Sequence, residues 1–192
     1  MNREKTKQLT SCALFAAIIY VATAVTGAVA PIGGGAYIHL GAAMIYISVL
    51  FLPAPYAVAA AAVGAALADF TLGSAVYIIP TIIVKSLVVL TAKGLMRLSK
   101  NALLQDILIC LAGVTTVIGY YIAEVVLMLI SGSQFNAALA GAAVNSIPFN
   151  TLQAGASAVV FLIVGGVVRK IADRKKKSAP SVDSEEGSDS AQ

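Results

Sequence analysis

The side chains that could do chemistry in this chain are few, and most of them recur at helical spacing. Two sets stand out, Tyr77, Thr81 and Lys85 in one segment and Tyr120, Tyr121 and Glu124 in another. Steps of three or four residues place the members of each set on one face of a helix. Together the sets offer an ammonium, a carboxylate and phenols, which are groups that recognise a small polar solute or carry a proton.

A third set adds amides and hydroxyls at the same kind of spacing. Ser146, Asn150, Gln153 and Ser157 follow at intervals of four, three and four, which makes one helical stripe. Tyr37 and His39 come directly after a run of three glycines. We interpret Asn150, Gln153, Tyr37 and His39 as further candidate solute contacts.

Covalent and metal chemistry have little support in the sequence. Cys12 and Cys110 lie in apolar runs, and with only one histidine they do not give a zinc site of normal spacing. No nucleophile and base stand at catalytic spacing, and the phosphate-binding motif of nucleotide hydrolases is absent. We therefore predict no catalytic residues, no metal, no cofactor and no enzyme activity.

Composition indicates which elements position these residues. The chain has 192 residues, of which 59% are hydrophobic and 11% charged, with a mean hydropathy of +0.89. A membrane-spanning helix needs about 20 apolar residues. We predict an all-α integral membrane protein whose six transmembrane helices cover 9–30, 38–52, 56–72, 76–96, 105–130 and 147–168.

Basic residues predict the orientation, because cytoplasmic segments of membrane proteins are enriched in lysine and arginine. They cluster before the first span, between the fourth and fifth, and after the last. Both termini are then cytoplasmic, and the cell membrane is the expected location. We predict a basic N-terminus over 1–8, a transmembrane domain over 9–170, and a basic then acidic disordered tail over 171–192.

The connections follow from that orientation. Ser131 to Ser146 is expected as an external loop, and the second and third spans are short enough to need packing beside longer helices. We expect Lys175 to Lys177 to anchor the last helix to lipid headgroups rather than to bind nucleic acid.

In this topology the polar candidates all fall in the outer half of the membrane, and the inner half is nearly devoid of polar side chains. A channel needs polar groups along its full length, whereas a solute pocket needs them at one depth. We therefore expect a pocket open to the outside. The loop of Gly33, Gly34 and Gly35 is the expected lid, because glycine imposes no single conformation.

Structural roles compete with binding for each of these residues. Asp69 and Lys85 are expected to form an ion pair between the third and fourth spans, with ligand contact as the alternative. Glu124 is either a ligand contact or a protonated packing group, and His39 either a ligand contact or an interfacial residue. The tyrosines suit an interfacial belt, and Asn150 and Gln153 suit bonds between helices equally well.

Several segments together carry a family resemblance. The segments that carry it are Tyr37-Ile-His-Leu-Gly41, Gly64-Ala-Ala-Leu-Ala-Asp69, Tyr77-Ile-Ile-Pro-Thr81 and Ile83-Val-Lys85. In these segments the chain resembles the substrate-binding S components of energy-coupling factor (ECF) vitamin transporters, and most closely the riboflavin-type S component family. The motif-level similarity covers about Tyr37 to Gly94. At the position after Leu40-Gly41 the family often has aspartate where this chain has Ala42, which puts one contact in doubt.

The resemblance implies partners and a mode of action. Such proteins bind a water-soluble vitamin or precursor and dock on a transmembrane T subunit that couples to two cytoplasmic ATPases. The first helix of the family contacts the T subunit through small residues four apart, and Ala13 and Ala17 match that pattern. Two other classes stay open: a solitary ion-coupled secondary transporter, and a membrane assembly or sensor protein without a solute.

Overall fold

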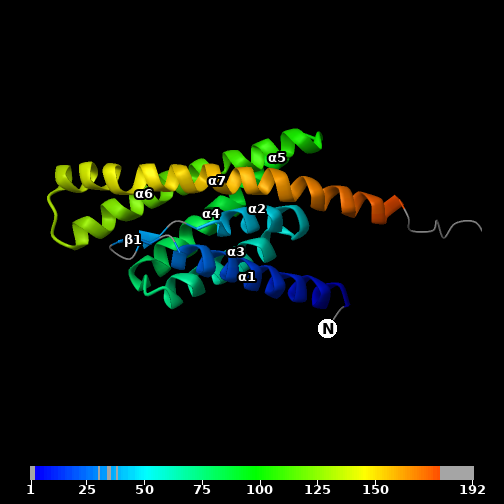
Figure 1. The fold of residues 1–192 in the computed structure, drawn as a ribbon, viewed down its shortest axis with the longest axis horizontal. Coiled ribbons are helices and arrows are strands. Elements are labelled where there is room, and N and C mark those ends of the chain that lie inside the picture. The colour runs from blue at the N-terminus through cyan, green and yellow to red at the C-terminus, as the bar shows by residue number, and fades with distance from the viewer. Residues whose placement is uncertain (1–2, 30, 34–35, 38, 178–192) are drawn as a thin grey trace, which may run out of the picture.

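The computed structural model describes residues 3–29, 31–33, 36–37 and 39–177 and consists almost wholly of helices. Figure 1 shows them as an elongated bundle. In chain order the elements are α1 (Arg3–Val29), β1 (Pro31–Gly33), β2 (Ala36–Tyr37), α2 (Gly41–Phe51), α3 (Ala54–Thr71), the 3-10 turn η1 (Ala75–Tyr77), α4 (Ile78–Met96), α5 (Ala102–Leu111), α6 (Gly113–Ile130) and α7 (Phe135–Lys177).

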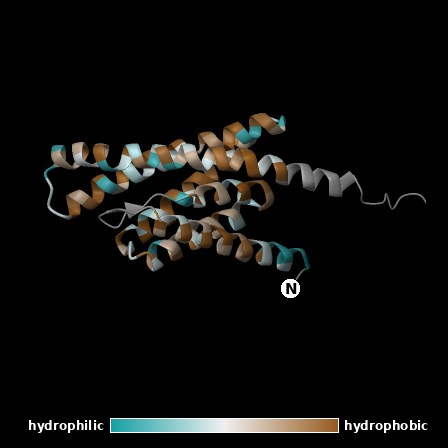
Figure 2. Cartoon of the chain, viewed as in Figure 1, coloured by the Kyte–Doolittle hydropathy of each residue, from teal (hydrophilic) through white to brown (hydrophobic). Residues whose placement is uncertain are grey.

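The apolar segments confirm the predicted membrane protein. Within the described residues, five helical stretches are long and apolar enough to cross a bilayer, and α2 is a shorter apolar helix. Figure 2 shows that hydrophobic residues predominate along the coloured parts of the helices and that hydrophilic residues lie at the start of α1. The chain is therefore an all-α, multi-pass membrane protein with six apolar segments.

Both described ends of the chain lie at the same end of the bundle. In Figure 1 the start of α1 and the end of α7 are on one side, and the α6–α7 connection is on the other. We call these the terminal end and the loop end. The same-side arrangement follows from an even number of spans.

The short helix α2 occupies the centre. Its 11 residues span about 16 Å, well below the ~30 Å of a bilayer core. Eight of them are buried, and the helix contacts α1, α3, α4 and α7. At its C-terminal end the Lys93 Nζ donates to the carbonyl oxygen of Val49 at 2.5 Å, which satisfies one of the carbonyls a helix end leaves free. A helix too short to span is thus stable because protein surrounds it.

Close packing of α1 on α3 depends on one glycine. A Cβ at Gly64 would lie 2.5 Å from the backbone oxygen of Ala16 and 3.0 Å from the Cβ of Ile19, so only glycine permits this approach. Ile19 itself is fully buried. The contact fixes the first helix against the third along much of their length.

The last helix differs from the prediction at both ends. Residues 135–146, expected in an external loop, are the first three turns of α7. The expectation was wrong because the alanine-rich segment before Pro148 favours a helix and proline is tolerated inside membrane helices, so the helix continues through Pro148. At the other end, 171–177 are helical although we expected disorder from 171, and Ser178 to Gln192 lie outside the described residues.

The fifth predicted span is two helices. α5 and α6 meet at Ala112, whose N–H donates to the carbonyl of Ile109, and α6 begins at Gly113. Between α1 and α2, β1 pairs antiparallel with β2, with Pro31 opposite Tyr37. Gly33 ends β1, while Gly34 and Gly35 of the expected lid lie outside the described residues.

Candidate functional site

Two of the predicted sets meet in a ladder of hydrogen bonds between α4, with η1 before it, and α6. Tyr77 Oη donates to Glu124 Oε2 at 2.8 Å, and the hydroxyls of Thr81 and Tyr120 lie 2.9 Å apart. The helices run in opposite directions, so a step of four residues on each brings the next pair together. Four residues predicted from spacing alone are therefore neighbours near the loop end of the bundle.

Lys85 comes one turn further along α4 and is buried, with 1% of its surface exposed. Its Nζ has no hydrogen-bond partner in the described part of the chain and lies 5.0 Å from the centre of the Tyr120 ring. That distance allows a cation–π interaction. Asp69, also buried, acts electrostatically on Lys85, but their predicted direct ion pair stays a prediction.

A second group of contacts holds the segment before α2. The backbone N–H of His39 donates to Gln153 Oε1 at 3.3 Å, and the N–H of Leu40 donates to Thr26 Oγ1 at 3.0 Å. The N–H of Gly41 donates to His39 Nδ1 at 3.1 Å, so this ring nitrogen carries no proton. Through Gln153 and Thr26, the chain that follows the β1–β2 turn is tied to both α7 and α1.

Burial and a nearby positive charge both disfavour the protonated form of His39. Its side chain is 6% exposed, and burial, together with the positive charge of Lys85, lowers the pKa of the imidazole well below its ordinary value. In the neutral form the ring proton is on Nε2, since Nδ1 accepts the bond from Gly41.

Other predicted residues lie outside the ladder. The amide of Asn150 donates to the carbonyl and the hydroxyl of Ser146 on its own helix, at 2.9 and 3.0 Å. Tyr121 packs instead against a separate apolar cluster of α6 and α7 that contains Val125 and Ala138. Tyr37 is in β2, and its side chain lies outside what the structure describes.

The structure also contains buried polar residues that sequence reasoning missed. Tyr46 on α2, Asp106 on α5 and Thr116 on α6 are 0%, 7% and 1% exposed. They lie closer to the terminal end than the ladder does, so the expectation of a half nearly devoid of polar side chains is wrong. Thr116 had a signal, because it continues the four-residue spacing of Glu124 and Tyr120.

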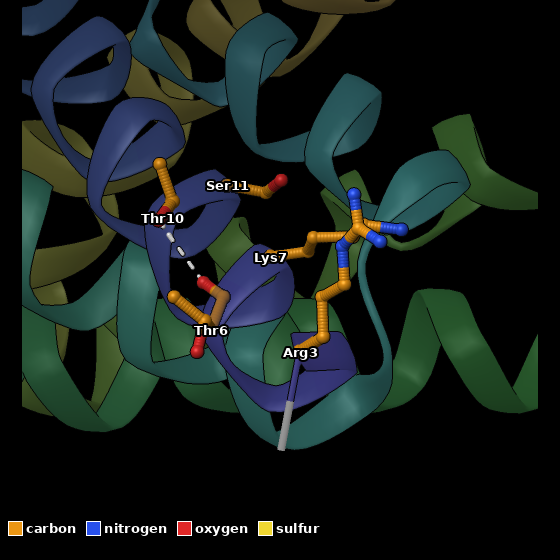
Figure 3. A pocket seen from close by; sticks show the side chains of 5 residues that line it. All are labelled: Arg3, Thr6, Lys7, Thr10 and Ser11. Atoms are coloured by element: carbon orange, nitrogen blue, oxygen red, sulfur yellow. Dashed lines mark hydrogen bonds between the residues drawn. The ribbon is translucent and has the colours of Figure 1, made fainter. Parts of the chain in front are cut away.

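The terminal end carries a hollow of a different kind. Figure 3 shows it on the first turns of α1, where the side chains of Arg3 and Lys7 extend toward the same side. The hollow has a volume of about 690 Å³, and Thr6, Thr10 and Ser11 complete its lining. Lys7 also pairs with the exposed carboxylate of Glu4 at 3.0 Å. Lipid phosphates at a membrane surface suit such a lining, but no predicted solute contact is here.

Ala13 and Ala17 are exposed on the same helix, beyond that hollow. Leu14 and Ile18 next to them are 60% and 38% exposed. The surface is thus apolar and open to lipid or to another membrane helix.

Chemically, the ladder and its surroundings offer hydrogen-bond donors and acceptors beside an aromatic ring. Among the described residues no three histidine, cysteine, aspartate or glutamate side chains gather as a metal site. The arrangement combines a carboxylate, an ammonium, hydroxyls and an aromatic ring within hydrogen-bonding distance of one another or one turn apart.

Comparison with known proteins gives one match. A family model described as "ECF-type riboflavin transporter, S component" matches residues 3–170, which is most of the chain. No curated protein and no solved structure matches.

Proposed function

We propose that this chain, which belongs to the ECF-type riboflavin transporter S component family, captures a small water-soluble vitamin or vitamin precursor from outside the cell at the loop end of its bundle. The family is that of the substrate-binding membrane subunit of ECF transporters. The observation that supports this site most is the Tyr77–Glu124 and Thr81–Tyr120 ladder with the buried ammonium of Lys85 beneath it.

The polar groups of the ladder suit a heteroaromatic solute. Phenol rings stack on flat ring systems, while Glu124 accepts and Lys85 donates hydrogen bonds to ring substituents. Lys85 makes no hydrogen bond to the described protein groups, so a carbonyl or ring nitrogen of the solute would satisfy one of its donors. Asn150, Gln153, His39, Tyr121 and Tyr37 are proposed as further contacts around this centre.

The segment from Gly33 to Tyr37 is the proposed lid. Its far side is tied down by the His39–Gln153 and Leu40–Thr26 bonds, so a movement of the β1–β2 turn is confined to the residues before His39. A turn that is fixed at its base can close over a solute without shifting α2.

Transport energy would come from partners. We propose that the exposed Ala13 and Ala17 contact the T subunit, which couples to two ATPases, because small residues let membrane helices approach closely. The basic terminal end would be cytoplasmic under the positive-inside rule, and the loop end would face outside.

Solute binding to the purified full-length protein tests the proposal. Riboflavin is the first probe, followed by a panel of vitamins, and the bound mass is read by native mass spectrometry. We expect a stoichiometric adduct with at least one member. Glu124→Gln and Lys85→Met should each weaken its binding at least about tenfold, the loss expected when a hydrogen bond to a charged group is removed.

Ser86→Ala is the matched control, because Ser86 follows Lys85 on α4 and its hydroxyl donates to its own helix at Ile82. Its affinity should equal that of the unaltered protein. An empty spectrum across the whole panel, or unchanged affinity in both Glu124→Gln and Lys85→Met, overturns the proposed site.

A solitary ion-coupled transporter is the second candidate, favoured by the burial of Asp69 beside Lys85. The two candidates differ in uptake by cells that express this chain alone. Uptake that needs no ATPase partner and stops with an uncoupler would support the ion-coupled transporter and overturn the ECF mechanism.

A further inference from the structure

Three buried hydroxyls near the middle of the bundle have no hydrogen-bond partner among the described residues. They belong to Tyr46 on α2, Thr116 on α6 and Ser157 on α7, and each residue is at most 1% exposed. Serine and threonine in helices usually bond back to a carbonyl one turn earlier, but Thr116 and Ser157 do not. A buried hydroxyl without a partner is costly, so three of them on facing helices need an explanation.

Neighbouring contacts place the three residues around one point. A Cβ added at Gly113 would lie 3.0 Å from Tyr46 Oη and 3.2 Å from Ala154 Cβ, so Tyr46 points at the place where α6 meets α7. Thr116 is one turn from Gly113, and Ser157 is one turn from Ala154.

A ring contact also places Tyr46 beside this part of α7. It packs edge-on against Phe161, with ring centres 5.7 Å apart, and Phe161 lies one turn beyond Ser157 on α7. Ser157 therefore lies between two residues that both contact Tyr46 or the glycine beside it.

We propose that Tyr46, Thr116 and Ser157 bind water inside the bundle, in a layer one helical turn toward the terminal end from the ladder. Water fits because each hydroxyl both donates and accepts, and buried water typically makes two to four hydrogen bonds to such groups. Because Gly113 lacks a Cβ, no side-chain atom of α6 lies at the position 3.0 Å from Tyr46 Oη.

The charge of the surroundings favours water over a metal ion. The four-residue step of the ladder brings Thr116 to the level of Lys85, whose ammonium repels a cation. Asp69 acts on Lys85 as a countercharge, so the layer does not require an anion either. The bound water would form the polar inner boundary of the candidate solute site. The proposal of bound water does not depend on the proposed function.

Removal of single hydroxyls from the full-length protein in detergent tests the layer. Loss of a hydroxyl that binds water should lower the unfolding midpoint, whereas loss of a buried hydroxyl without any partner should not. Tyr46→Phe, Thr116→Val and Ser157→Ala each delete a hydroxyl with little change of shape. If water is bound, each variant should lower the unfolding midpoint by about 2–4 °C. The Thr116→Val/Ser157→Ala double variant should lose less than the sum, since both residues hold the same water.

Ser48→Ala is the control, because Ser48 is equally buried and its hydroxyl already donates to the carbonyl of Ile45 at 2.7 Å. Its double variant with Ser157→Ala should be additive. A midpoint that rises or stays constant in all three hydroxyl variants means that the layer is dry and overturns the proposal.

Radiolytic hydroxyl labelling gives a second readout that does not depend on stability. Radicals formed from bound water oxidise the side chains beside it, so the buried Tyr46 and Phe161 should be labelled in the unaltered protein and at least fivefold less in the Thr116→Val/Ser157→Ala variant. Absence of label at both rings overturns the proposal. So does a weakened binding of the solute without any change in midpoint, which would assign the hydroxyls to the solute instead.

Discussion

The ladder and the layer beneath it contain similar residue types, but the hydrogen bonds of their side chains differ. In the ladder, tyrosine, threonine and glutamate bond to one another across α4 and α6. One turn away, tyrosine, threonine and serine are buried without a bond to a described protein group. The difference shows that burial of a polar side chain in a membrane bundle does not by itself specify its partner: pairing rigidifies a site, whereas unpaired groups leave capacity for a bound molecule.

The largest effect is expected where a carboxylate loses its donor. Tyr77→Phe leaves the half-buried Glu124 without its 2.8 Å bond, and the loss of a bond to a charged group costs about 1.5–3 kcal/mol. Chemical or thermal unfolding in detergent measures the loss. In a cycle with Glu124→Gln the two effects should not add, and additive effects would mean that the pair is not coupled.

Gly113→Ala should have the next largest effect, because it acts on the unpaired layer. The new Cβ would lie 3.0 Å from Tyr46 Oη and 3.2 Å from Ala154 Cβ, so the buried phenol must shift. Overpacking of this kind costs about 1–3 kcal/mol. Gly155→Ala on α7 has open space around its Cβ and serves as the control. Equal stability of both variants would show that the layer is loosely packed.

The pH dependence of stability should come in part from His39, the single histidine of the chain. Its pKa is lowered on folding, so the unfolded chain takes up a proton that the folded chain does not. Stability should therefore fall as the pH drops below about 6.5, by up to about 1.4 kcal/mol per unit. Unfolding curves between pH 7.5 and 5.5 measure this, and His39→Gln should remove most of the slope. An unchanged slope in that variant would assign the pH dependence to the carboxylates.

Thr81→Val should have the smallest effect of the series. It removes one partner of the neutral Thr81–Tyr120 pair, which is worth about 1 kcal/mol. The Thr91–Thr115 pair, at 3.3 Å, connects α4 to α6 away from the ladder and provides a comparison. If Thr81→Val costs no more than Thr91→Val, the ladder is no stronger than an ordinary contact between helices.

Much of the fold could be predicted, because it depends on local composition. The length of the six apolar segments, compared with the thickness of a bilayer, predicts the membrane helices. The clusters of basic residues predict the orientation of the chain. The start of α7 was wrong because the alanine-rich segment 135–146 continues the helix through Pro148, and membrane helices tolerate an internal proline. The break between α5 and α6 at Ala112 has no strong sequence signal at all.

The candidate site was predictable only where spacing determines neighbours. The Tyr77–Glu124 and Thr81–Tyr120 pairs follow from two four-residue repeats on antiparallel helices. The bond between the His39 backbone and Gln153 joins residues 114 positions apart, and no periodicity indicates it. Tyr46 was likewise hidden, because a tyrosine in an apolar run looks like an interfacial residue until α2 is found at the centre of the bundle.

The length of α7 has a consequence for how motion of this protein can be observed. Its 43 residues extend about 65 Å, roughly twice the thickness of a bilayer core, and its last turns continue past the terminal end of the neighbouring helices in Figure 1. Such a helix works as a pointer fixed to the bundle: any tilt of the whole protein in the membrane moves the tip near Lys177 further than it moves the core. A fluorescent label near Lys177 would therefore report a reorientation that labels in the core would barely register.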